Sequence, residues 1–70
     1  MMVDMNIELS LADDEARELA SALDIRLLEM RSELAHTDDH AYKNDLRRSR
    51  DRLQAVAQRL DRLLASQKAA

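Results

Sequence analysis

The chain of 70 residues contains no glycine, proline, cysteine, tryptophan or phenylalanine, and its single aromatic side chain is Tyr42. Average usage would give about five glycines and three or four prolines in a chain of this length. Their absence argues against folds built from tight turns, such as β-sandwiches, small barrels and phosphate-cradling loops. The lack of cysteine excludes a disulfide framework, a Cys-based zinc knuckle and a thiol nucleophile.

The residues that are present are those of long amphipathic helices, rich in alanine, leucine, arginine and acidic side chains. A chain this short forms one domain, and below ~70–80 residues a core usually needs a disulfide, a metal or self-association. No apolar run reaches the ~20 residues that span a bilayer, and no signal-peptide pattern is present. We therefore expect a cytoplasmic protein that associates with itself.

Charge is distributed unevenly along the chain, whose net charge is −3. Residues 10–36 contain seven acidic and three basic side chains, whereas residues 37–66 contain five acidic and seven basic side chains. An acidic first half and a basic second half suit two helices that pack antiparallel.

Residues 3–11 alternate strictly between apolar and polar side chains. A period of two predicts a half-buried strand over residues 3–9. No other segment has this pattern, so the backbone groups of the strand would lack a partner within the chain. We expect it to pair with the same strand of a second copy across a two-fold axis, and a frayed N-terminus is the alternative.

The first helix is predicted over residues 10–36, with Ser10 as its N-cap and acidic residues in its first turn. Its predicted core stripe is Ala12, Ala16, Leu19, Leu23, Leu27, Met30 and Leu34. Ile25 and Leu28 lie well off this stripe. Two large aliphatic side chains in that position predict a second apolar surface, which we assign to contact between copies.

The second helix is predicted over residues 37–66, with Thr37 as its N-cap. Because glycine is absent, any left-handed residue at the end of the first helix is expected at His36 or a polar neighbour. The predicted core stripe of the second helix is Tyr42, Leu46, Ser49, Leu53, Val56, Leu60 and Leu63, and Ala57 and Leu64 widen it. This heptad pattern indicates coiled-coil-like packing, with the Tyr42 hydroxyl reaching water.

These elements predict an all-α fold, an antiparallel two-helix hairpin with a short N-terminal β-strand, in a single domain over residues 1–70. Two hairpins would then form a four-helix bundle, with their strands paired over one end. The predicted dimer interface is Val3, Met5, Ile7, Leu9, Ile25 and Leu28.

Side chains that carry chemistry are scarce. His36 and His40 have the spacing of a helical metal site, but they straddle a predicted helix break. The acids between them stand where capping would place them, so a capped turn is the preferred interpretation. No serine has a base at a fixed distance, and no carboxylate pair lies in a recognisable cleft. The sequence predicts no enzymatic site, no cofactor and no metal.

The outer side of the predicted second helix carries a sparse arginine stripe, Arg48, Arg52, Arg59 and Arg62. Such a stripe can contact phosphates. The chain is net acidic and lacks aromatics for base stacking, so a solvated face or pairing with the acidic first helix is preferred. The strand–helix–helix order also matches ribbon-helix-helix repressors. Against that fold, the helices are too long, the turn glycine is missing, and phosphates would repel the acidic face of the predicted strand.

One set of positions between residues 23 and 53 carries a family resemblance: Leu27, Met30, Arg31, Glu33, Leu34, Ala35, Thr37, Asp38, Tyr42, Lys43, Leu46, Arg50 and Leu53. At these positions the chain resembles a group of short bacterial proteins of unknown function. Those proteins typically read LxxLRxEIAxTDxxxYRxxLKxRExxL, between a strand-like N-terminal segment and a leucine-rich turn of helix. Where they often carry Glu after the second arginine, this chain has Asp51. The resemblance implies a helical hairpin and no particular activity.

With no site for chemistry, the sequence predicts a homo-oligomeric protein-interaction or scaffold module. Its expected partner is a second copy of itself, with another protein as a further option and no membrane partner. The alternative is nucleic-acid or anion binding through the arginine stripe of the second helix.

Overall fold

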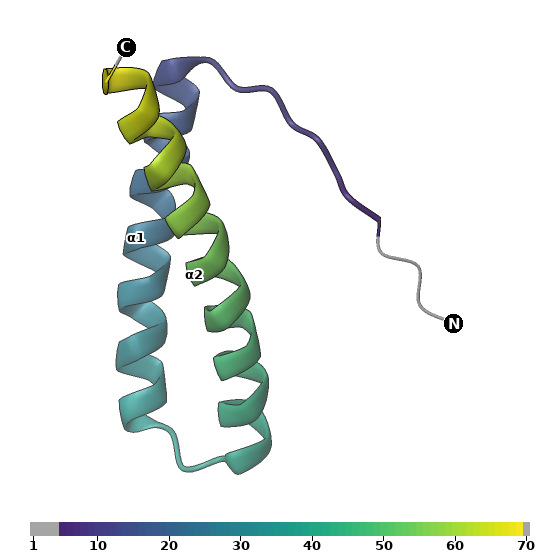
Figure 1. Cartoon of the computed structure of the whole chain (residues 1–70). Coiled ribbons are helices and arrows are strands. Elements are labelled where there is room, and N and C mark those ends of the chain that lie inside the picture. The colour runs from purple at the N-terminus through teal and green to yellow at the C-terminus, as the bar shows by residue number, and fades with distance from the viewer. Residues whose placement is uncertain (1–4, 70) are drawn as a thin grey trace.

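The computed structural model describes the backbone of residues 5–69 and the side chains of residues 5–67. Within this range, two helices, α1 (Asp13–His36) and α2 (His40–Ala69), run antiparallel and are joined by residues 37–39 (Figure 1). The molecule measures 46 × 35 × 16 Å, so its shortest dimension is little more than the width of one helix with its side chains. The structure confirms the all-α helical hairpin and shows that it is a single layer.

The N-terminal segment, residues 5–12, forms neither helix nor strand. It leaves the open end of the hairpin and runs away from both helices (Figure 1), and Met5, Ile7 and Leu9 are all exposed. The strand predicted over residues 3–9 is therefore absent from the described part of that range, because a lone strand has no partner for its backbone groups. Val3 lies outside the described residues.

Helix α1 begins three residues later than predicted, so Ser10 is not its N-cap. Ala12 holds that position in an extended conformation, and Glu15 Oε1 accepts a hydrogen bond of 2.9 Å from the Ala12 backbone N–H. Glu15 reaches back from the first turn, where the helix dipole also favours its charge. The predicted Ser10 cap is therefore wrong, and the glutamate bonds to the backbone N–H of the N-cap residue instead.

The N-terminus of α2 is capped by Asp39 rather than by Thr37. Asp39 Oδ1 accepts hydrogen bonds from the backbone N–H groups of Ala41 and Tyr42 at 3.0 and 3.2 Å. Thr37 ends α1 with extended dihedral angles, φ −100° and ψ 140°, and none of the described residues has a positive φ. An extended residue therefore replaces the left-handed one that was considered at His36, and it imposes no need for glycine.

We predict that Asp39→Ala lowers the free energy of unfolding by about 1 kcal/mol, because two backbone donors of α2 lose their acceptor. Urea unfolding followed by circular dichroism measures the change. Asp38→Ala is the matched control, since the neighbouring Asp38 is also exposed and accepts neither of these two bonds. An equal loss of stability in the two variants would contradict the cap at Asp39.

The helices bury a narrow seam between them. Its buried side chains are Ala16, Leu23, Met30, Leu46 and Ala57. Half-buried leucines complete it at positions 27, 34, 53, 60 and 64. On α1 the seam largely confirms the predicted stripe, although Ala12 and Leu19 are exposed.

On α2 the predicted stripe is partly wrong. Val56 and Leu63 are 45% and 65% exposed, whereas Ala57 and Leu64, which were expected only to widen the stripe, are buried and half-buried. At every second position of the predicted stripe, the residue that lies in the seam is therefore the one that follows the predicted residue. A small side chain, Ala57, therefore occupies the seam position that the heptad assigned to Val56.

Candidate interaction surfaces

One hydrogen bond between the helices sets the pairing along one edge of the seam. The Tyr42 hydroxyl donates to Glu33 Oε1 at 2.8 Å, rather than reaching only water as predicted. In an antiparallel pair, successive heptads toward the open end continue the same edge. Counting by sevens from Glu33 and Tyr42 puts Arg26 at the level of Ser49, Leu19 at that of Val56, and Ala12 at that of Leu63.

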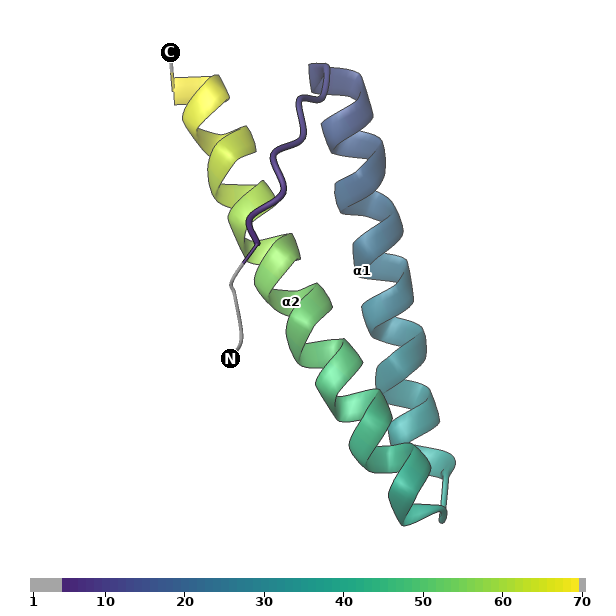
Figure 2. The same cartoon turned by 90° about the vertical axis from the view of Figure 1, so that its right-hand side faces the viewer.

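The open half of this edge is apolar. We call Leu19, Val56 and Leu63 the apolar flank, and all three side chains are exposed in the single chain. Leu63 also lines a hollow together with Leu9, Leu11, Leu60 and Leu64. The N-terminal segment therefore leaves the hairpin on the side of the apolar flank, and Figure 2, seen from that side, shows it crossing in front of α2.

The closed half of the same edge is polar. Arg26 Nη1 lies 2.8 Å from Glu33 Oε2, and Glu33 also accepts the hydrogen bond from Tyr42. These hydrogen bonds, first that from Tyr42 and then that from Arg26, hold the pKa of Glu33 below its ordinary value. The bond to Glu33 in turn raises the pKa of the Tyr42 phenol, because its neutral form is the donor. A fixed polar contact therefore joins the helices beside the turn.

We predict that Tyr42 ionises above the pH at which an unperturbed tyrosine does, and that Glu33→Gln moves the midpoint back toward that pH. Absorbance at the tyrosinate wavelength reports this residue alone, because the chain has no other aromatic side chain. A midpoint unchanged by Glu33→Gln would contradict the hydrogen bond.

The two pKa shifts also fix how this contact affects stability. Since the folded-state pKa of Tyr42 is raised, its contribution is present below the ordinary tyrosine pKa and is lost as pH rises through the raised value. The pKa of Glu33 is lowered, so its contribution is present above the ordinary glutamate pKa and is lost as pH falls through the lowered value. The contact therefore stabilises the hairpin over the whole neutral range.

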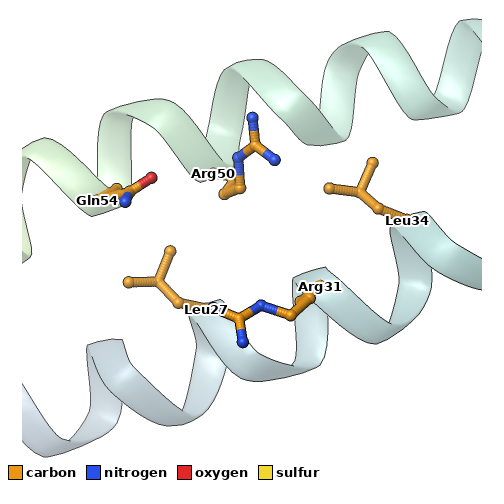
Figure 3. A pocket seen from close by; sticks show the side chains of 5 residues that line it. All are labelled: Leu27, Arg31, Leu34, Arg50 and Gln54. Atoms are coloured by element: carbon orange, nitrogen blue, oxygen red, sulfur yellow. The ribbon is translucent and has the colours of Figure 1, made fainter.

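The opposite edge of the seam holds a hollow lined by Leu27, Arg31, Leu34, Arg50 and Gln54 (Figure 3). Its two guanidinium groups come from different helices and do not converge on a common point. Arg50 is half-buried, and its Nη2 lies 3.0 Å from Asp51 Oδ1. No arginine was predicted in the seam. Arg50 lies seven residues before Ala57, and this spacing places both on the same face of α2.

The arginine stripe Arg48, Arg52, Arg59 and Arg62 lies exposed along α2. Arg48 Nη1 lies 3.7 Å from Asp45 Oδ1 on the same helix, and Arg62 Nε donates to the Gln58 carbonyl at 3.4 Å. Among the side chains of residues 5–67, no ion pair joins α1 to α2. The stripe is therefore a solvated face, and the suggested pairing of its arginines with the first helix does not occur in the described hairpin.

Ile25 and Leu28 form a second apolar surface on α1, where they are 61% and 63% exposed. At ~100° per residue, both lie more than ~100° around α1 from Leu19. They therefore do not extend the apolar flank, and their predicted role as contacts between copies concerns a different side of the hairpin.

The histidines beside the turn are not gathered into a metal site. His36 Nδ1–H donates to the Ser32 carbonyl at 2.8 Å, which ties the ring to its own helix. Over the described part of the chain, no group of three or more His, Cys, Asp or Glu side chains is placed to hold a metal ion. Neither helix in that part combines the length and apolar character that crossing a bilayer requires.

No protein-family model, curated protein or solved structure matches this chain. The resemblance of residues 23–53 to short bacterial proteins therefore gains no support from a family match. The two-helix architecture that it implied is the part that the structure confirms.

Proposed function

We propose that the chain is a homo-oligomeric protein-interaction module whose hairpin associates with a second copy into a four-helix bundle. The observation that carries this proposal is the apolar flank, a row of large aliphatic side chains exposed along one edge of the seam. A helical layer normally buries such a row against a second layer. Here the second layer would be another hairpin.

The amount of exposed surface supports the same conclusion. The chain exposes 6203 Å², whereas a compact monomer of 8.0 kDa exposes about 4,500 Å². Part of the excess belongs to the extended N-terminal segment and part to the exposed helix faces, on which a stable interface would bury about 800 Å² per partner. The buried core of five side chains includes two alanines and is small for an independent domain.

Sedimentation equilibrium at micromolar concentration tests the proposal directly. We predict a dimer or larger species, with the concentration dependence of a reversible association. A monomer that keeps full helicity and unfolds cooperatively would overturn it, because the hairpin would then be stable without a second layer.

The charge of α2 supports a second candidate function, the binding of nucleic acid or another anion. Its eight basic and three acidic side chains give α2 a net charge of +5, and the arginine stripe is exposed. Salt-dependent mobility shifts with a short duplex would support it if replacing the four arginines by glutamine weakened them. Absence of binding at low salt would remove this candidate.

A further inference from the structure

The two helices carry opposite charges that the hairpin does not use. Helix α1 has seven acidic and three basic side chains, a net charge of −4, whereas α2 has a net charge of +5. The ion pairs of the described hairpin all lie within one helix or the other. Charge complementarity between α1 and α2 is therefore available to a partner.

A second hairpin can be placed on the apolar flank by a two-fold axis in two ways. An axis perpendicular to the helices sets α1 against the partner's α1, and α2 against the partner's α2, so like charges face each other. An axis parallel to the helices sets α1 against the partner's α2, so −4 faces +5 at both contacts. Like charges held together are unfavourable, and complementary potentials fix the register of an interface.

From this difference we infer that the apolar flank binds a second copy about an axis parallel to the helices, with the two open ends side by side. The inference rests on the proposed function and adds the orientation of the partner. A rotation about this axis leaves the height of every residue along the helices unchanged. Leu19 therefore meets the partner's Val56, and the two apolar flanks face each other. The polar halves that contain Tyr42 likewise lie together.

The same orientation specifies an ion pair at the rim of the interface. Glu15 precedes Leu19 by four residues and Arg59 follows Val56 by three, so each lies one turn away on the outer side of the apolar flank. Both side chains are exposed, and in the described hairpin neither takes part in an ion pair. In the antiparallel contact between α1 and the partner's α2, Glu15 comes opposite the partner's Arg59.

The N-terminal segments give independent support for this orientation. Each segment leaves the open end on the apolar-flank side, toward the partner. With the open ends together, the segments of the two copies leave from the same end of the dimer and cross each other, because the axis reverses their outward course and keeps their descent along the helices. The perpendicular axis would send the two segments to opposite ends of the dimer.

A charge-swap experiment tests the orientation. In a Glu15→Arg homodimer and in an Arg59→Glu homodimer, like charges face each other at both rim positions, and we expect each dissociation constant to rise about tenfold. In a mixture of the two variants, both rim pairs become attractive again. We expect the mixed dimer to form with a dissociation constant near that of the wild type, measured by sedimentation of one fluorescently labelled variant with the other.

Glu15→Arg also removes the hydrogen-bond acceptor of Ala12, so Glu15→Gln is the control that keeps an acceptor and removes only the charge. The lost cap is common to the Glu15→Arg homodimer and to the mixture, and cannot account for recovery on mixing. A wild-type dimer whose variants associate normally, or whose mixture shows no recovery, overturns the orientation alone. A wild-type monomer overturns the proposed function as well.

Discussion

Leu23→Ala is expected to remove most of the stability of the hairpin. Leu23 is 8% exposed in the middle of α1, and truncating a buried leucine costs about 2–5 kcal/mol. A domain of this size commonly has only about 3–5 kcal/mol from its core. We therefore expect the thermal transition of the variant, followed by circular dichroism at 222 nm, to become broad and to begin well below that of the wild type.

Leu28→Ala is the matched control, since it makes the same chemical change on the same helix at a side chain that is 63% exposed. It shares the helix propensity change of Leu23→Ala and removes almost no burial within the hairpin. We expect a loss below about 1 kcal/mol. Equal effects of the two substitutions would contradict the seam that the structure assigns to α1.

Leu63→Glu is expected to abolish association at micromolar concentration while leaving the hairpin folded. The side chain is 65% exposed in the single chain, so a carboxylate there remains hydrated in the monomer. In the proposed dimer it would be buried against the partner, and losing a buried aliphatic contact in an interface is worth about 2–4 kcal/mol. The dissociation constant should therefore rise by a factor of about 30 to 1,000.

Sedimentation equilibrium measures that change, and circular dichroism checks that helicity is retained. Leu28→Glu introduces the same charge at a side chain of similar exposure on a different side of the hairpin. We expect it to change the dissociation constant less than threefold, which is below about 1 kcal/mol. If Leu28→Glu dissociates the dimer and Leu63→Glu does not, the interface lies on the surface of Ile25 and Leu28 instead.

The sequence predicted the two helices because their apolar periodicity is long and no glycine or proline interrupts it. It misplaced both helix starts by three residues. At each start several polar side chains can bond to backbone N–H groups, and spacing alone predicts neither the bond from Ala12 to Glu15 nor the cap at Asp39 instead of Thr37. Only the backbone geometry decides which oxygen reaches a donor.

The apolar flank was hidden for a different reason. Helix α2 carries two neighbouring stripes, and the one with Val56 and Leu63 is the more hydrophobic, so periodicity assigns it to the hairpin. In the structure the helices pack through the neighbouring stripe that contains Ala57. Hydrophobicity ranks stripes by transfer free energy, but packing also depends on shape. The α2 residues of the apolar flank belong to the stripe that is not buried between α1 and α2.

The short turn that Asp39 caps also has a consequence for the kinetics of folding. Contacts next to residues 37–39 close the smallest loops, so they form at the lowest entropic cost. Pairing of the helices then proceeds from the turn toward the open end. The interhelical contacts near Leu19, Val56 and Leu63 are therefore the last to form and the first to open. A partner bound to these residues would stabilise the open end of the hairpin, which unfolds locally most readily. Association would then slow unfolding more strongly than the same free energy placed beside the turn.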